Sequence, residues 1–301
     1  MRTAIIFGAT GQDGVYLSHV LAGHGICVHA VSRKSGFKGD VADRAFVQGL
    51  VQKLQPDYIF HLAANSTTRH DALFENHATI CTGTLNILES VRLYAPFARV
   101  FITGSAMQFK NQGRPIDENT AFNASSPYAV ARIQATYAAR YYRDSFAVKS
   151  YVGFLFNHDS PLRTERHISQ KIVASIKRIQ AGLESRLVIG DMTVRKEFTY
   201  AGDIVDAIWL LVNQDKVFEC VIGSGKAFAI EDWVRYCCQK TGVCFDAHVF
   251  SDKAYTPEYR TLLCKPQRIQ SLGWEPKVSF MDLADMMLEG CDSRLAAAKK
   301  Y

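Results

Sequence analysis

The feature that most limits the fold is the glycine-rich segment GATGQDG at residues 8–14. It follows an apolar run over Thr3–Phe7, which is typical of a buried strand, and it leads into a helical pattern over Gln12–Ala22. Such a turn lets the backbone approach a pyrophosphate, to which the helix N-terminus presents free N–H groups. A tight turn without a ligand is the alternative. In this context the segment predicts a dinucleotide site made of Gly8, Thr10, Gly11, Gln12, Asp13 and Gly14.

The first half of the chain alternates short apolar runs with helical patterns. This alternation predicts an α/β fold with a doubly wound parallel sheet of the Rossmann type. The expected strands are Thr3–Phe7, Cys27–Val31, Tyr58–Leu62, Val100–Thr103 and Ser150–Leu155. The expected helices are Gln12–Ala22, a segment around Phe46–Leu54, another around Leu85–Tyr94, and Tyr128–Phe146.

The second half is less regular, and no linker or repeat separates it from the first. Its expected helices are Ser169–Gln180, Gly202–Val212, Ile230–Lys240 and one from about Met281. Its expected strands are Leu187–Ile189, Val217–Ile222 and Cys244–Val249, and Pro257–Pro266 has the composition of a loop. We therefore expect residues 1–155 to bind the dinucleotide. Residues 156–301 should form a smaller α/β lobe that binds mainly substrate and is not an independent domain.

Composition excludes several classes of protein. The net charge of +6 comes from scattered Lys and Arg residues, so no basic tail for nucleic acid is expected. The eight cysteines lack zinc-ligand spacing, which predicts no metal site and reduced thiols in the cytoplasm. No signal peptide is expected, and no apolar run has the length of a membrane span. We expect no nucleic-acid or membrane partner.

The end of the second expected strand bears on the choice of dinucleotide. An acidic residue there would bind the ribose hydroxyls of NAD(H), whereas cations favour the additional phosphate of NADP(H). The chain has Arg33, Lys34 and Ser35 at this point. These residues predict a preference for NADP(H) over NAD(H). A solvated basic turn is the alternative.

A second cluster could carry proton transfer. Ser105 follows the expected strand Val100–Thr103, and Tyr128 and Arg132 are four residues apart on one expected helix. This spacing brings the cation beside the phenol, where it stabilises the phenolate. Ser105 could hydrogen-bond the same substrate oxygen. The cluster predicts a catalytic set for carbonyl reduction or alcohol oxidation, although ordinary packing explains the residues equally well.

The chain resembles one family in several motifs. These are the glycine-rich segment, Asp40-Val41, LAANS at 62–66, DENT at 117–120, SPYAV at 126–130, FNHDSPLR at 156–163, AGD at 201–203 and LGW at 272–274. Nearly end to end, they resemble GDP-mannose 4,6-dehydratase and its sister GDP-6-deoxy-4-keto-mannose reductases. Both belong to the extended short-chain dehydrogenase/reductase family, also called the NAD-dependent epimerase/dehydratase family. The resemblance implies a nucleotide-sugar enzyme that binds a nicotinamide dinucleotide.

The resemblance also implies roles for individual residues. Cofactor contacts are implied for Asp40, Val41, Leu62, Ala63, Ala64, Ser66, Tyr128, Arg132, His158 and Arg163. Substrate contacts are implied for Ser105, Met107, Asn157, Lys171, Arg195 and Glu258. Cations suit a diphosphate, and the Glu258 carboxylate suits the ribose hydroxyls of guanosine. For Lys171 a solvated helix face is the alternative.

The chain departs from the family's pattern at three places. The family's dehydratases have Glu where this chain has Met107, and a thioether cannot remove the C5 proton. Arg132 replaces the family's Lys, and the two cations differ in shape. The loop over 36–39 is shorter than the subunit-pairing loop of the dehydratases, so we expect a homodimer and not a tetramer.

Three functions remain open on this basis. The favoured one is an NADP(H)-dependent oxidoreductase that reduces C4 of a GDP-linked 4-keto-6-deoxyhexose, with Tyr128 as proton donor and Ser105 orienting the oxygen. The second is a GDP-mannose 4,6-dehydratase that uses a base other than residue 107. The third is a non-catalytic NADP-binding sensor or partner protein.

Overall fold

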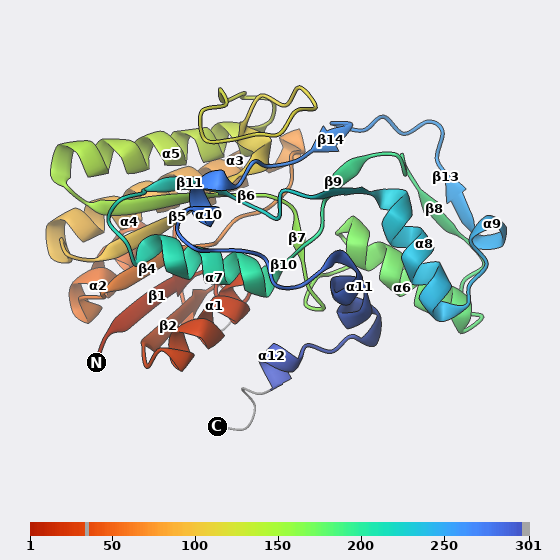
Figure 1. The fold of residues 1–301 in the computed structure, drawn as a ribbon. Coiled ribbons are helices and arrows are strands. Elements are labelled where there is room, and N and C mark those ends of the chain that lie inside the picture. Colours follow the sequence, from red (N-terminus) through yellow and green to blue (C-terminus); the bar gives the residue numbers. More distant parts are fainter. Residues whose placement is uncertain (34–35, 297–301) are drawn as a thin grey trace.

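In the computed structural model, the described residues 1–33 and 36–296 form a seven-stranded sheet with helices on both faces (Figure 1). The strand order is β11-β6-β5-β4-β1-β2-β3, and every neighbouring pair is parallel. The strands are β1 (Thr3–Phe7), β2 (Cys27–Ser32), β3 (Phe37–Lys38), β4 (Tyr58–His61), β5 (Arg99–Ser105), β6 (Lys149–Leu155) and β11 (Glu219–Ile222). The predicted doubly wound Rossmann-type sheet is confirmed.

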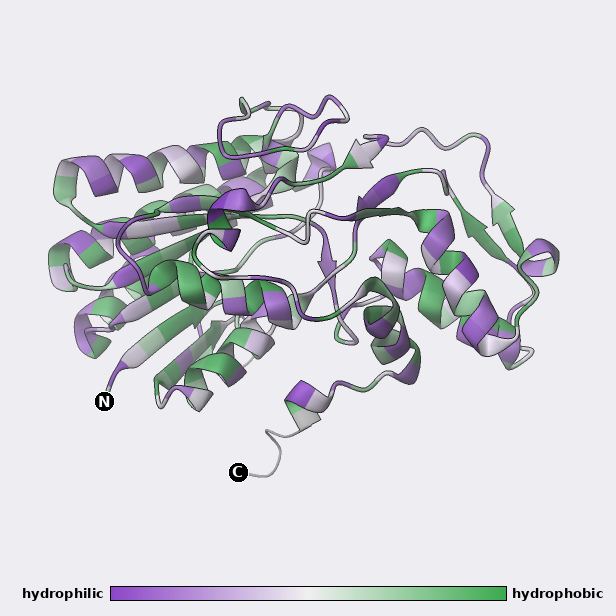
Figure 2. Ribbon diagram, in the orientation of Figure 1, coloured by the Kyte–Doolittle hydropathy of each residue, from purple (hydrophilic) through white to green (hydrophobic). Residues whose placement is uncertain are grey.

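Two helical layers bury both faces of this sheet. One layer contains α1 (Gln12–Gly23) and α7 (Ala201–Val212). The other contains α2 (Arg44–Leu54), α4 (Gly83–Tyr94) and α5 (Pro127–Phe146). Successive strand residues point to opposite faces, so strands buried on both sides are apolar throughout. Figure 2 shows this concentration of hydrophobic residues in the strands.

The remaining elements form a smaller lobe beside the carboxyl ends of the strands (Figure 1). Its main helices are α6 (Ile168–Gln180), α8 (Ile230–Thr241) and α11 (Phe280–Glu289), with the short α9 (Phe245–His248). The short α10 (Gln267–Gln270) lies instead against β11 of the main sheet, and α12 (Ser293–Ala296) follows α11. Its strands are β7 (His158–Asp159), β8 (Leu187–Ile189), β9 (Arg195–Glu197), β10 (Thr199–Tyr200), β12 (Ala227–Ala229), β13 (Val249–Ser251) and β14 (Thr261–Leu262). The second half also supplies α7 and β11 to the main sheet, so the two regions share one core.

Short helical segments complete the first half. They are a 3₁₀ turn over His70–Ala72, α3 (Leu73–Asn76), a π-helix over His77–Thr82 and a 3₁₀ turn over Ala106–Gln108. The π-helix runs directly into α4. Inserted π-turns are rare and frequently accompany functional sites.

One predicted strand is wrong and another segment is more ordered than predicted. Residues 245–249 alternate apolar and polar side chains, which resembles a strand, yet Phe245–His248 form one helical turn. Pairing with β8 begins only at Val249. The turn places the Phe245 ring 3.9 Å from the Arg235 guanidinium carbon of α8. Within the predicted loop Pro257–Pro266, Thr261–Leu262 pair with β9.

Candidate active site

Three cavities line the carboxyl edge of the sheet and share residues with their neighbours. The first cavity lies among the glycine turn, the end of β2 and the chain after β4. The central cavity, about 440 Å³, lies over the turn and the ends of β5 and β6. The lobe cavity, about 760 Å³, lies between the chain after β4 and the lobe. Leu62 and Ala64 border the first two cavities, and Ser66 and Met107 border the last two. Together they form one continuous cleft.

The glycine turn has a shape that other residues would obstruct. Gly8 has φ +88°, and a Cβ atom there would lie 2.6 Å from the Ala63 nitrogen. A Cβ atom on Gly14 would lie 2.5 Å from the Gly8 carbonyl oxygen. Gly11 is the N-cap of α1 and makes no side-chain capping bond, so the first turn of α1 presents backbone N–H groups at the central cavity. This cradle fits the diphosphate of a dinucleotide.

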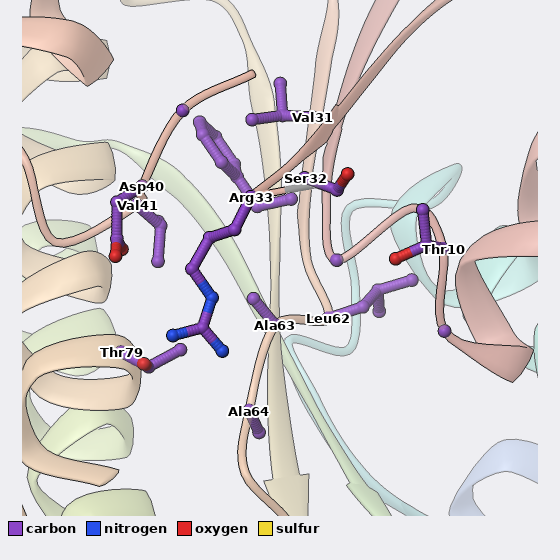
Figure 3. Close-up of a pocket in the computed structure, with 14 residues that line it drawn as sticks. Thr10, Val31, Ser32, Arg33, Asp40, Val41, Leu62, Ala63, Ala64 and Thr79 are labelled. Carbon is purple, nitrogen blue, oxygen red and sulfur yellow. The ribbon is translucent and has the colours of Figure 1, made fainter. Parts of the chain in front are cut away.

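The first cavity brings together most residues predicted to contact the adenosine end of a dinucleotide. Its lining residues include Arg33, Asp40, Val41, Leu62, Ala63 and Ala64. In Figure 3 the Arg33 side chain extends across the cavity toward Thr79 and Ala64. Arg33 also forms an ion pair with Glu75, with 3.3 Å between Nη2 and Oε1. Lys34 and Ser35 lie outside the described residues.

Thr79 lines the same cavity, and sequence reasoning missed it. It lies in the π-helix, and its carbonyl oxygen is 3.1 Å from Nε2 of His61 at the end of β4. Because an inserted π-turn leaves no clear periodic signal in the sequence, only the structure reveals this wall of the cavity.

A buried ion pair supports the central cavity. His158 Nε2 lies 3.0 Å from Asp13 Oδ1, and His158 Nδ1 lies 2.7 Å from the Phe156 carbonyl oxygen. Both ring nitrogens therefore face acceptors, which requires the imidazolium form. Burial alone would lower the pKa of His158, but the Asp13 carboxylate more than offsets it and raises that pKa above its usual 6.5. Burial would raise the pKa of Asp13, but His158 holds it well below its usual range.

Ser105, Tyr128 and Arg132 meet at the central cavity, as predicted for a catalytic set. Ser105 ends β5, and its Oγ accepts a bond from the Met107 N–H at 3.2 Å. Tyr128 lies in the first turn of α5, which Ser126 caps by accepting from the Ala129 N–H.

Gln108 holds this arrangement together, and sequence reasoning missed it. It is fully buried. Its Oε1 accepts from the Ser105 N–H at 2.9 Å, and its Nε2 donates to Thr136 Oγ1 of α5 at 3.1 Å. These two bonds fix the end of β5 relative to the helix that carries Tyr128.

Arg132 lies behind Tyr128 and is almost completely buried. Its guanidinium carbon is 5.1 Å from the centre of the Tyr128 ring, and its Nη1 donates to the Thr103 carbonyl oxygen. Its Nε has no hydrogen-bond partner among the described residues. Burial and the positive charge of Arg132 lower the pKa of His61 to about 3. The cation thus lies behind the Tyr128 ring at the base of the central cavity.

The lobe cavity contains most of the predicted substrate residues. Asn157, Lys171, Glu258 and Met107 line it, and the buried Asn157 Oδ1 has no partner among the described residues. The Oε1 atom of Glu258 accepts a 2.5 Å bond from Thr68, which joins the lobe to the chain after β4.

Arg195 is not among the described residues that line the lobe cavity, which differs from its predicted role. Its side chain is directed to the other face of β9, where Nη2 donates to the Ala227 carbonyl oxygen at 2.8 Å. Lys196, the next residue, lines the cavity and is buried. Side chains alternate along a strand, so a shift of one residue exchanges the two faces. Burial lowers the pKa of Lys196, and the carboxylate of Asp159 opposes that shift.

Three more basic residues lie near Lys196, and two of them were missed. Arg163, Arg166 and His167 border both the central and the lobe cavities, and only Arg163 was predicted. Burial and the charge of Arg163 lower the pKa of His167 to about 4. The junction of the two cavities therefore has permanent cations and a neutral imidazole at neutral pH.

Comparison with known proteins identifies similar sequences and folds. The sequence profile of the family described as GDP-mannose 4,6 dehydratase matches residues 36–287. GDP-mannose 4,6-dehydratase of Yersinia enterocolitica is 30% identical, over 96% of this chain and 94% of that protein. GDP-mannose 4,6 dehydratase 1 of Arabidopsis thaliana is 28% identical, over 99% of this chain and 92% of that protein.

Two solved structures share the fold. One is dTDP-glucose 4,6-dehydratase of Bacillus anthracis in complex with NAD, with a TM-score of 0.85 and 16% identity. The two structures superpose over 96% of this chain and 96% of that chain. The other is RMD of Pseudomonas aeruginosa complexed with NADPH, with a TM-score of 0.84 and 20% identity. It covers 96% of this chain and 98% of that chain.

We expect His158→Gln to lower the free energy of unfolding more at about pH 6 than at about pH 9. The folded-state pKa of His158 is raised, so its contribution is fully present below the unfolded value of 6.5 and is lost as the pH rises through the folded value. Urea unfolding of both proteins at the two pH values measures the difference. In the Asp13→Asn background this pH dependence should disappear. An equal loss at both pH values in the wild-type background would contradict the imidazolium assignment.

Proposed function

Because the chain belongs to the GDP-mannose 4,6-dehydratase family of extended short-chain dehydrogenases/reductases, we propose that it is an NADP(H)-dependent ketoreductase. Its substrate would be a GDP-linked 4-keto-6-deoxyhexose, reduced at C4. The observation that carries this proposal is the combination at the central cavity. Ser105, Tyr128 and a buried cation are together there, and Met107 lines the same cavity where the family resemblance implies the dehydratase base.

The cleft suits the two ligands that this reaction needs. The glycine turn and the first turn of α1 would hold the cofactor diphosphate, and Arg33 would face the 2′-phosphate of NADP(H). When bound, this cofactor supplies or accepts a hydride. The lobe cavity has the size of a typical ligand site, and Lys196 and Lys171 on its wall suit a sugar-nucleotide diphosphate.

The chain's own residues then account for the proton. Tyr128 would donate its phenolic proton to the substrate oxygen at C4 as negative charge develops there. The Ser105 hydroxyl would donate a hydrogen bond to the same oxygen and orient it. Arg132 lies 5.1 Å behind the Tyr128 ring and would stabilise the phenolate that remains.

The identity of residue 107 favours reduction over dehydration as the proposed reaction. Dehydration of GDP-mannose needs a base that removes the C5 proton, and a thioether has no basic lone pair at neutral pH. Met107 lines both the central and the lobe cavities, so its side chain occupies the boundary between the two proposed ligands. Reduction at C4 needs no group there.

We expect the wild-type protein to oxidise NADPH when given a GDP-linked 4-keto-6-deoxyhexose and to form little 4-keto-6-deoxy product from GDP-mannose. Loss of a general base typically reduces the rate by about 10²–10⁴-fold. Chromatographic product analysis of both incubations measures this. Tyr128→Phe serves as the inactive control that still binds cofactor. Efficient conversion of GDP-mannose would instead assign the dehydratase activity. No reaction in either incubation would favour the third function, a non-catalytic NADP-binding protein.

We expect Lys196→Met to raise the KM for the sugar nucleotide by about tenfold or more and to change kcat less. A cation that contacts the diphosphate stabilises the bound substrate and the transition state equally, so its loss weakens binding without slowing the chemical step. The matched variant Arg195→Met should have little effect, since Arg195 bonds to Ala227 on the opposite face of β9. Steady-state kinetics of both variants make the comparison. A larger KM effect from Arg195→Met would restore the sequence-based assignment.

We also propose a homodimer through the outer faces of α4 and α5. Tyr137 and Tyr141 of α5 are 57% and 56% exposed, and Phe97 after α4 is 91% exposed. Tyr137 and Tyr141 are four positions apart on α5 and so share one face, and exposed apolar side chains gathered on one face mark association surfaces.

Sedimentation should give twice the 33.6 kDa mass of the chain. Tyr141→Glu should shift the protein toward the monomer, because it places a charge in the apolar contact. Leu183→Glu, at an exposed position in the lobe, should not. A monomeric wild type would contradict the proposed dimer.

A further inference from the structure

We propose that Glu75 moderates the preference between NADP(H) and NAD(H) by holding the guanidinium of Arg33. The inference rests on the proposed dinucleotide site and concerns which dinucleotide that site favours. Neither the glycine-rich motif nor the basic turn after β2 points to Glu75, because it lies on the short helix α3, 42 positions after Arg33.

Arg33 is the one cation among the described residues that line the first cavity. Its side chain is 65% exposed, and Figure 3 shows its guanidinium extended over the opening between Asp40 and Ala64. A phosphate at the 2′ position of an adenosine ribose bound here would have this guanidinium as its cationic partner.

Glu75 already forms an ion pair with the Arg33 guanidinium. Its Oε1 is 3.3 Å from Arg33 Nη2, and its Oε2 accepts from Asn65 Nδ2 at 2.7 Å. The carboxylate is therefore held by Arg33 and by the chain after β4, which also forms the floor of the first cavity through Ala63 and Ala64.

The two dinucleotides meet this pair differently. A 2′-phosphate carries close to two negative charges, so it must share the guanidinium with Glu75 and is repelled by that carboxylate. A free 2′-hydroxyl has no charge and can donate a hydrogen bond to the carboxylate of Asp40 or of Glu75. Glu75 should therefore weaken NADP(H) binding selectively and leave NAD(H) binding nearly unchanged.

Glu75→Gln tests this with little disturbance to the fold. The Gln side chain keeps the volume and an oxygen that can accept from Asn65, and it removes only the charge. The matched control is Glu231→Gln, which removes the charge of a Glu that pairs with Arg235 on α8 at 2.7 Å. Glu231 lies in the lobe, outside the lining of the first cavity.

Calorimetric titration with NADPH and with NADH measures the effect without any turnover. We expect Glu75→Gln to tighten NADPH binding by about two- to fivefold, the scale of a partly exposed ion pair, and to change NADH binding by less than about twofold. Glu231→Gln should change neither. Unchanged or weaker NADPH binding in Glu75→Gln would overturn the inference and make Glu75 a support for Arg33.

The Arg33→Ala background tests whether the effect passes through Arg33. There, Glu75→Gln should tighten NADPH binding less than it does in the wild type, since no guanidinium remains to be released. An equal gain in both backgrounds would mean direct repulsion and would overturn the proposed competition. If the folded wild type bound neither dinucleotide, the proposed cofactor site would fail, whereas binding of both with no response to Glu75→Gln would refute only this inference.

Discussion

The close approach of the glycine turn to the chain after β4 is the contact on which the cleft depends. Gly8 places its α-carbon so near Ala63 that no side chain fits between them. That contact brings the turn against the chain that follows β4, and the first turn of α1 borders the central cavity. The first and central cavities lie on the two sides of this crossing and share Gly8. A bulkier residue at Gly8 would push the turn away from Ala63 and disturb the junction where one elongated ligand could extend from the first cavity into the central cavity.

Three groups of charges along the cleft are compensated within the protein. His158 faces Asp13 beside the glycine turn, Arg163 and Lys196 face Asp159, and Arg33 faces Glu75. The first two groups are buried, so their geometry is fixed and an unpaired charge there would be strongly destabilising. The Arg33 pair is exposed, and its charges can be rearranged at little free-energy cost. The same arrangement of opposite charges therefore fixes the centre of the cleft and leaves its adenosine end adjustable.

The sequence predicted the main sheet and its helices because their signals are local. Buried parallel strands are apolar throughout, and their helices repeat every three to four residues. The residues of the site were harder to predict from the sequence. Arg195 and Lys196 are both plausible diphosphate ligands, and only the orientation of β9 shows that Lys196 lines the cavity. Glu75 and Gln108 act through contacts with distant segments, which no spacing rule detects. The strand predicted at residues 244–249 failed because an alternation of this length fits one helical turn equally well.

Arg132 bears on whether the cluster still performs chemistry. A guanidinium buried beneath Tyr128, whose Nε finds no partner in the described part of the chain, costs free energy that a neutral residue of similar size would not. Its one described hydrogen bond is to the carbonyl of Thr103, at the end of the strand that carries Ser105. In the proposed site the cofactor diphosphate would lie at the glycine turn, so Arg132 is placed to act on the Tyr128 ring and not on the diphosphate. Buried charges are retained at such a cost where a nearby group changes its charge during function. In this cleft that group would be the Tyr128 phenol, so the position of Arg132 supports the proposed proton transfer. The proposed reduction, unlike dehydration, needs no base at Met107.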